Sequence, residues 1–158
     1  MIDLVPMTDG EYQEYREKEI ARYADEKVKT GSWDSSGALH RAELELQSLL
    51  PTRSSTEGLR FLMIRDRDTG NKVGILCYGR PPDGSMSDYY IYDIRIFDRF
   101  QRNGYAHKAL AKLEDEARNK GMASLALHVS VHNKPALRLY EKLGYEVTNY
   151  RMQKVLRR

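Results

Sequence analysis

A strand-helix-strand unit between Tyr89 and Val131 restricts the fold of this chain more than any other part of its sequence. Aromatic and β-branched residues fill 89–97, apolar residues then recur at helical spacing, and a second apolar run covers 124–131. A helical crossover makes the two strands that it joins parallel. Mixed sheets of this kind bind ligands at the carboxyl ends of the parallel strands, so the segment after Phe97 is the first candidate for a site.

Two helices are expected before this unit. A short strand near residues 2–5 leads into the first helix, where Thr8 and Glu11 form a capping box. Apolar residues at helical spacing mark the second helix, which Pro51 stops.

The remaining elements complete one mixed sheet. The β-prone runs 59–65 and 72–78 form an antiparallel meander with 89–97. Asn133 caps a last helix, and a final strand pair occupies 146–156. These elements predict an α+β fold with about four helices and a mostly antiparallel sheet of six or seven strands, in which one central pair is parallel.

Composition limits the class of protein. The length of 158 residues suits one compact domain, 1–158, and no apolar run approaches the roughly 18 residues of a membrane helix. The opening residues 1–4 include an acid where a secretory signal would be basic, and the lone Cys77 cannot form an internal disulfide. We therefore expect a cytoplasmic protein with no membrane contact.

The net charge of +3 is unevenly distributed along the chain. Residues 1–88 carry 12 basic and 16 acidic side chains, whereas residues 89–158 carry 14 and 7. The second half is therefore the better candidate for binding an anion, with an uneven surface composition as the alternative.

The segment 98–107 joins the end of the strand to the start of the crossover helix near Gly104. The first turn of a helix exposes backbone N–H groups without an intrahelical partner and carries a partial positive charge, so it binds phosphates. Gly104 lets a ligand approach the backbone, and Arg102 and Lys108 add positive charge. A capped helix with no ligand is the alternative, since the Walker and full dinucleotide patterns are absent.

Two motifs carry a family resemblance. The first reads Gln101-Arg102-Asn103-Gly104-Tyr105-Ala106. The second, at 133–145, reads Asn-Lys-Pro-Ala-Leu-Arg-Leu-Tyr-Glu-Lys-Leu-Gly-Tyr. They resemble the signatures Gln/Arg-x-x-Gly-x-Gly/Ala and Asn-x-x-Ala-x-x-x-Tyr-x-x-x-Gly-Phe of the GNAT superfamily of N-acetyltransferases, with Tyr145 in place of the usual Phe.

The resemblance implies acetyl-CoA as the donor. Its pyrophosphate would lie on the turn formed by Gln101, Arg102, Asn103, Gly104, Tyr105 and Ala106. The pantetheine arm would pair like an added strand with Ile94, Arg95, Ile96 and Phe97. That pairing requires a splayed central strand pair, which the family usually achieves with a bulge, expected here near Arg95 and Ile96.

The reaction implied by the resemblance is direct attack of a primary amine on the thioester, without a covalent enzyme intermediate. Tyr140 matches the family tyrosine that protonates the departing thiolate, and Asn133 would bond the donor's amides. Each has a structural alternative, because Tyr140 also falls on the apolar face of its helix and Asn133 can cap that helix.

Asp93 is the candidate general base, because it is an acid within an otherwise apolar and aromatic strand. Strand alternation places Ile91, Asp93, Arg95 and Phe97 on one face of the sheet. An ion pair of Asp93 with Arg95 is the structural alternative.

The resemblance places the acceptor over the first two helices and the loop 30–37, which contains Trp33. This loop either closes over a substrate or simply joins the helices. The acids of the first helix favour a cationic acceptor such as a polyamine, a lysine side chain or a peptide amino terminus. These acids are Glu11, Glu14, Glu17, Glu19, Asp25 and Glu26.

Other readings of the sequence stay open at this point. A catalytically silent acyl-CoA-binding or regulatory module is the main rival, whereas nucleic-acid binding rests only on a pI near 8.9 and terminal basic residues. His128 and His132 lie too far apart on an extended strand to share a metal, so no metal is expected. The sheet edge near the C-terminus leaves a homodimer open.

Overall fold

The structure is a computed structural model, and it describes residues 1–47, 50 and 58–156. The chain divides into two compact units, Met1–Leu127 and His128–Arg158, and each is described by itself. The predicted end of the second helix at Pro51 lies outside the described residues. Within the described part of the chain, no helix is long and apolar enough to cross a membrane.

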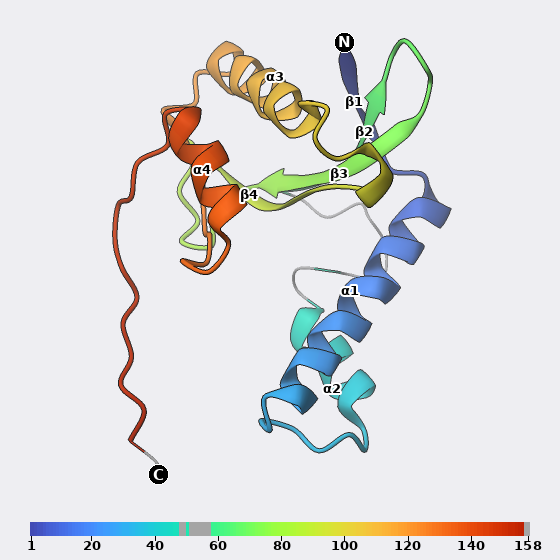
Figure 1. Cartoon of the computed structure of the whole chain (residues 1–158), viewed down its shortest axis with the longest axis vertical. Coiled ribbons are helices and arrows are strands. Elements are labelled where there is room, and N and C mark those ends of the chain that lie inside the picture. Colours follow the sequence, from blue (N-terminus) through green and yellow to red (C-terminus); the bar gives the residue numbers. More distant parts are fainter. Residues whose placement is uncertain (48–49, 51–57, 157–158) are drawn as a thin grey trace. The chain divides into compact units, whose positions relative to one another are not determined.

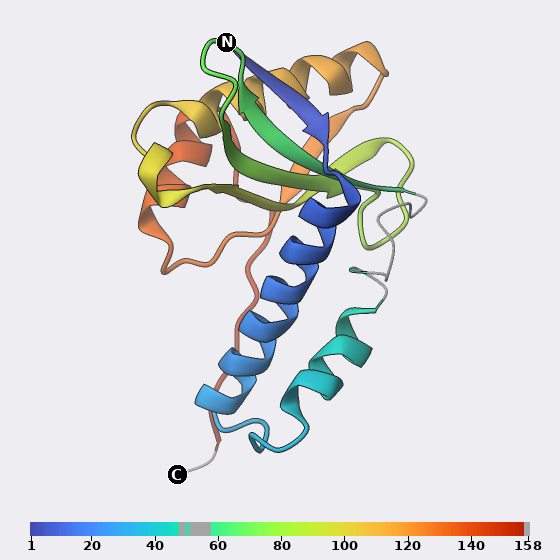
Figure 2. The same ribbon diagram turned by 90° about the vertical axis from the view of Figure 1, so that its right-hand side faces the viewer.

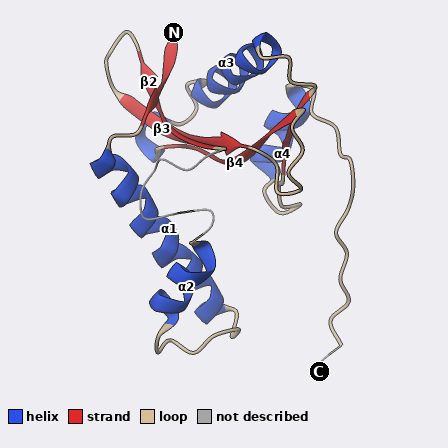
Figure 3. Ribbon diagram, turned by 180° about the vertical axis from the view of Figure 1, so that it is seen from behind, coloured by secondary structure: helices blue, strands red, loops and turns tan. Residues whose placement is uncertain are grey.

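The first unit contains a mixed sheet with helices on both faces (Figures 1 and 3). Its described strands follow the chain in the order β1-β2-β3-β4-β5, and the pairing is antiparallel except between β4 and β5, which are parallel as predicted. The strands are β1 (Ile2–Pro6), β2 (Leu59–Asp66), β3 (Lys72–Gly79), β4 (Asp88–Ile96) and β5 (Ser124–Leu127). The helices are α1 (Asp9–Lys29), α2 (Ala38–Leu46), the short 3-10 helix η1 (Asp98–Phe100) and α3 (Tyr105–Asn119).

The predicted capping box starts α1. The Glu11 amide donates to the Thr8 hydroxyl at 3.1 Å, and the Thr8 amide donates to the Glu11 carboxylate at 2.9 Å. Two backbone N–H groups that a helix start leaves unsatisfied are therefore bonded, which fixes where this long helix begins.

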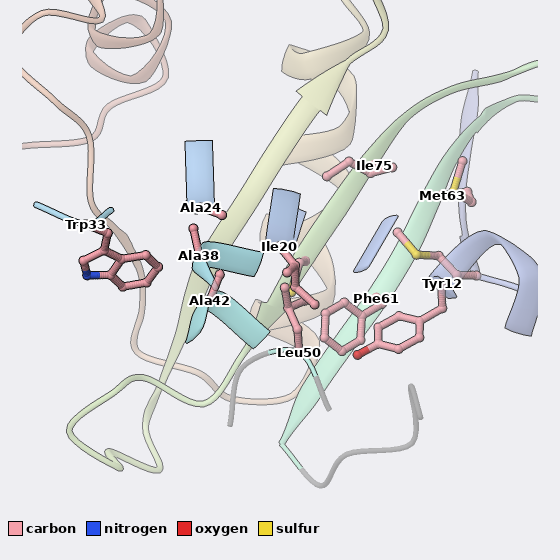
Figure 4. Close-up of a cluster of buried hydrophobic side chains, with 12 residues drawn as sticks. Tyr12, Ile20, Ala24, Trp33, Ala38, Ala42, Leu50, Phe61, Met63 and Ile75 are labelled. Atoms are coloured by element: carbon pink, nitrogen blue, oxygen red, sulfur yellow. The ribbon is translucent and has the colours of Figure 1, made fainter. Parts of the chain in front are cut away.

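Helices α1 and α2 lie side by side (Figure 2), and their buried side chains pack in one cluster with those of β2 and β3. Small residues line their contact, because Ala24 of α1 lies near Ala38 and Ala42 of α2 (Figure 4). Tyr12 packs edge-on against Phe61 of β2, with 4.8 Å between ring centroids. This cluster also includes Met63, Ile75 and Cys77 and forms the main core of the first unit.

Helix α3 packs against the sheet through contacts with β1, β4 and β5. Its residues Leu110 and Leu113 are fully buried. The Tyr78 hydroxyl of β3 donates to Glu116 of α3 at 3.4 Å, so alternate residues of β3 serve the two faces of the sheet.

The second unit contains α4 (Lys134–Lys142). The Asn133 side chain accepts a hydrogen bond from the Ala136 amide at 3.3 Å, which confirms the predicted cap. Gly144 follows the helix with a φ of 95°, in the left-handed region that glycine adopts without a Cβ penalty.

The prediction of six or seven strands is wrong for the described residues, which form five. The parallel strand ends at Leu127, short of the predicted Val131, and 146–156 contain no helix or strand. The apolar residues of this C-terminal segment do not alternate strictly, and Tyr150 and Met152 are 77% and 88% exposed. A strand forms only where a ladder partner and a buried face exist, and local β propensity supplies neither.

The bulge of β4 lies at Tyr92, so its expected position near Arg95 and Ile96 is wrong. Cys77 of β3 pairs with Asp93, but the next residue, Tyr78, pairs with Ile91, which leaves Tyr92 as the extra residue. An extra residue reverses the alternation of side chains. Asp93 and Arg95 therefore lie on one face of the sheet as predicted, whereas Ile91 lies on the opposite face.

Candidate functional site

The anion-binding turn, defined as residues 101–106, is shaped by its own side chains. Gln101 donates from its side-chain amide to the Ile96 carbonyl at 3.0 Å, and Asn103 donates to the Phe100 carbonyl at 3.1 Å. Arg102 and Gly104 both have left-handed backbones, with φ values of 66° and 78°. These bonds hold the turn open ahead of α3 without using the backbone N–H groups at the start of that helix.

The start of α3 fits an anion. Among the described residues, no side chain caps this helix. A Cβ built on Gly104 would have no neighbour within 4 Å, so the space in front of the first N–H groups is open. Exposed helix N–H groups, the helix dipole and the charge of Lys108 in the first turn together suit a phosphate.

Tyr105 connects the anion-binding turn to the β2–β3 hairpin. Its hydroxyl donates to the Asp66 carboxylate at 2.5 Å. This hydrogen bond lowers the pKa of Asp66 and raises the pKa of Tyr105. The first residue of α3 is therefore fixed to the sheet by a contact 39 residues away in sequence.

The strand segment that precedes the turn is paired on one side. Ile94, Arg95 and Ile96 have ladder partners on β3, and the Phe97 amide donates to the Val73 carbonyl at 2.8 Å. The parallel ladder with β5 ends earlier, at the pair Ile91 and Leu127. Within the described part of the first unit, the other edge of residues 94–97 has no ladder partner.

Asp93 is held by two side chains. The Tyr15 hydroxyl donates to Asp93 Oδ2 at 2.8 Å, and the Arg95 guanidinium donates to the same oxygen at 2.7 Å. Asp93 Oδ1 has no hydrogen-bond partner among the residues that the structure describes. The ion pair with Arg95, left open from the sequence, is thus present, and one carboxylate oxygen is still available.

An ion-pair chain links β4 to α1. Arg95 also bonds Glu19, and Glu19 pairs with Arg22 at 2.5 Å. Burial disfavours the charge of Arg95, but hydrogen bonds and attraction from Asp93 and Glu19 outweigh it and raise the pKa of Arg95.

Two neutral groups lie beside this ion-pair chain. Burial and the nearby charge of Asp93 raise the pKa of Tyr15, so its hydroxyl stays protonated and donates. Burial also raises the pKa of the Cys77 thiol to about 12, which keeps it protonated at neutral pH and disfavours nucleophilic attack by Cys77.

A cavity of about 200 Å³ lies between α1, α2 and the sheet, and we call it the α1–β4 cavity. Among the described residues, its charged lining residues are Asp93, Glu19, Glu26 and Arg22. The rest of the described lining is aliphatic, aromatic or thiol: Tyr15, Tyr23, Leu46, Leu50, Leu59, Phe61, Cys77 and Tyr92.

Two acids of this cavity, Glu19 and Glu26, were among those that the sequence placed on the acceptor side, whereas Tyr15, Arg22 and Tyr23 were not singled out as site residues. Tyr15, Glu19, Arg22, Tyr23 and Glu26 recur at helical spacing, so they form one stripe along α1. This mixture of aromatic and charged residues on the face that also carries the apolar core is the signal that would have revealed them.

The loop between α1 and α2 does not supply a mobile aromatic residue. Trp33 is buried and packs edge-on against Tyr23, with ring centroids 5.8 Å apart. The Arg41 guanidinium lies over the Trp33 ring at 4.5 Å. Trp33 therefore belongs to the core, and the loop is an ordinary helix connection at this residue.

Asn133 and Tyr140 lie in the second unit. The Asn133 side chain caps α4, and the Tyr140 ring packs edge-on against Tyr145 with 5.5 Å between centroids. Their contacts with a donor stay predictions.

Metal ligation has no support in the structure, since the described residues contain no group of three or more His, Cys, Asp or Glu side chains that could hold a metal ion.

Comparisons with known proteins agree with this geometry. Residues 13–145 match the model of the acetyltransferase (GNAT) family. The chain is 31% identical over 153 residues to the uncharacterized N-acetyltransferase YdgE of Bacillus subtilis, covering 97% of both chains. It is 34% identical over 157 residues to the uncharacterized N-acetyltransferase YycN of the same organism, covering 98% of this chain and 99% of that one.

Solved structures share the fold. The crystal structure of YycN, described as a putative acetyltransferase, matches with a TM-score of 0.82 at 32% identity and covers both chains completely. The aminoglycoside N-acetyltransferase AAC(6')-Iy in complex with CoA matches with a TM-score of 0.59 at 17% identity, over 99% of this chain and 95% of that one. The motifs, the mixed sheet with its parallel pair and the family match lead to one conclusion: this chain belongs to the GNAT family of N-acetyltransferases, which use acetyl-CoA.

Proposed function

We propose that this enzyme transfers the acetyl group of acetyl-CoA to a primary amine that binds in the α1–β4 cavity. The observation that carries the proposal is the position of Asp93, which lines this cavity on the strand that leads directly into the anion-binding turn. The match of residues 13–145 to one family model crosses the division at Leu127, which supports a single domain of residues 1–158.

The residues available for the donor fit its chemistry. Backbone N–H groups of Arg102, Asn103, Gly104, Tyr105 and Ala106 would meet the pyrophosphate, since the start of α3 is open and uncapped by a side chain. The edge of residues 94–97 would meet the pantetheine amides by strand addition. Acetyl-CoA supplies an acetyl thioester, which an amine attacks directly.

In the transfer, a bond forms between the amine nitrogen and the acetyl carbon while the carbon–sulfur bond breaks. The amine loses a proton, and Asp93 would accept it through Oδ1, since Tyr15 and Arg95 bond Oδ2. The departing thiolate takes a proton, for which the family motif suggests Tyr140. Asn133 is assigned to the donor's amides on the same ground.

Thiol release from acetyl-CoA tests this proposal. The enzyme is assayed with small amines, amino acids, peptides and amine-bearing antibiotics, and acetyl-CoA alone gives the hydrolysis background. We expect at least one amine to raise thiol release well above that background and to yield the acetylated amine by mass spectrometry. Acetyl-CoA binding without acceleration by any amine would instead support a catalytically silent acyl-CoA-binding module.

A further inference from the structure

The α1–β4 cavity also indicates which amine it accepts. We propose, on the basis of the function proposed above, that the preferred acceptor is a monoamine whose amino group is attached to a compact apolar body. The amino group would lie at Asp93 and Tyr15, with the apolar body along α2 and β2.

The walls of the cavity carry the first part of this inference. Leu46 and Leu50 line it from the side of α2, and Leu59 and Phe61 line it from β2. An apolar cavity of about 150 Å³ is large enough for benzene, so a space of about 200 Å³ suits a ring or a short alkyl chain. Hydroxyl groups placed against these walls would lose their hydrogen bonds to water.

The charges of the lining carry the second part. The lining acids Asp93 and Glu19 both pair with Arg95, which lies outside the lining. Arg22 lines the cavity and also pairs with Glu19, so two carboxylates meet two guanidiniums and this network has no net charge. An acceptor with several ammonium groups therefore gains little from it.

Three other acids of α1 are paired with lysines, and Asp9 and Glu17 are not lining residues of the cavity. Glu14 pairs with Lys18 at 2.9 Å, Asp25 pairs with Lys29 at 3.0 Å, and Glu11 pairs with Lys72 at 2.5 Å. The excess of acids along this helix therefore gives no support to a polycationic acceptor.

Glu26 is the one lining acid outside these pairs among the described residues. It is exposed and lies seven residues beyond Glu19, about 11 Å along the helix. An exposed carboxylate attracts a second ammonium only weakly, because water and salt screen it. One polar end and one apolar body describe the ligand that fits.

Two amines with five carbon atoms each test the inference. Pentylamine and 1,5-diaminopentane share the reacting end and differ at the fifth carbon, which carries only hydrogen in one and an ammonium group in the other. We expect kcat/KM for pentylamine to exceed that for 1,5-diaminopentane by at least about tenfold. Equal values, or a preference for the diamine, would overturn the inference while leaving amine acetylation intact.

A matched pair of variants on one helix tests the wall itself. Leu46 lines the cavity, whereas Leu44 on the same helix is 63% exposed. Leu46→Gln should lower kcat/KM for pentylamine about tenfold and change that for ethylamine much less, and Leu44→Gln should change neither. Identical effects of the two substitutions would contradict an apolar acceptor wall.

Calorimetry of amine binding separates this inference from the proposed function. Pentylamine should bind the unmodified protein more tightly than 1,5-diaminopentane, whether or not acetyl transfer follows. Preferential binding without any thiol release would contradict the proposed function alone, and tighter binding of the diamine would contradict the inference alone.

Discussion

The anion-binding turn and the α1–β4 cavity are built in opposite ways. The turn comes from six consecutive residues that offer backbone N–H groups, and its shape follows from local bonds such as Gln101 to the Ile96 carbonyl. The cavity comes from side chains of α1, α2, β2, β3 and β4, and its contact between Tyr15 and Asp93 spans 78 residues. The proposed donor site thus depends on backbone geometry, whereas the proposed acceptor site depends on side chains from distant parts of the sequence.

The largest effect is expected at the turn. Gly104→Glu places a carboxylate in the open space before α3 and should weaken CoA binding by at least about 100-fold, because it repels phosphate and occupies its position. Gly37→Glu is the matched control. Gly37 also precedes a helix, with a φ of 74° and no neighbour within 4 Å of a built Cβ, so it carries the same backbone strain. Equal CoA dissociation constants for the two variants in calorimetry would show that the pyrophosphate is misplaced.

The next effect is expected in the cavity. Asp93→Asn keeps the shape of the side chain but removes the base, so kcat should fall about 100-fold while CoA affinity is retained. Asp88→Asn, at the start of β4, provides a control because the Asp88 side chain bonds only Ser85 and Ser124 among the described residues. A kcat for Asp93→Asn close to that of Asp88→Asn, measured by thiol release, would remove Asp93 from the mechanism.

A smaller effect is expected for the second motif. Tyr140→Phe should reduce kcat about tenfold by removing the proton donor to the thiolate, with little change in the stability of the protein. Tyr145→Phe removes a hydroxyl from the neighbouring ring and restores the residue usual at this position. If both substitutions lower kcat equally, the contribution of Tyr140 is packing and not proton transfer.

The smallest effect concerns the anchor of the turn. The Asp66 pKa is lowered in the folded state, so its contribution to stability is present above its ordinary pKa of about 3.9 and is lost as the pH falls through the folded value. Tyr105→Phe removes the main cause of this shift. The urea midpoint should therefore fall less between pH 6 and pH 3 in Tyr105→Phe than in the unmodified protein. Tyr150→Phe changes a residue that is 77% exposed, and its urea midpoint should fall as much as that of the unmodified protein.

What the sequence predicts follows the same division between local and long-range structure. The Thr8 and Glu11 box, the Asn133 cap and the start of the crossover helix near Gly104 depend on neighbours a few residues away, and all three were predicted. The parallel pair of β4 and β5 was also predicted, because a helical crossover leaves little choice of strand direction.

Features that depend on distant partners were not predicted correctly. The bulge at Tyr92 is an offset between two strands, and it sends Asp93 and Ile91 to opposite faces. No local pattern contains that offset. The prediction of strands in 146–156 was wrong for a related reason. A strand needs a hydrogen-bonded partner strand, and the segment's own sequence does not encode one.

The most direct measurement of the central claim is the KM of each substrate in two variants, one for each region. With acetyl-CoA and pentylamine as substrates, Gly104→Glu should raise the KM of acetyl-CoA and leave that of the amine nearly unchanged. Leu46→Gln should raise the KM of the amine and leave that of acetyl-CoA nearly unchanged. If either variant raises both KM values to the same degree, the turn and the cavity do not act as separate donor and acceptor sites.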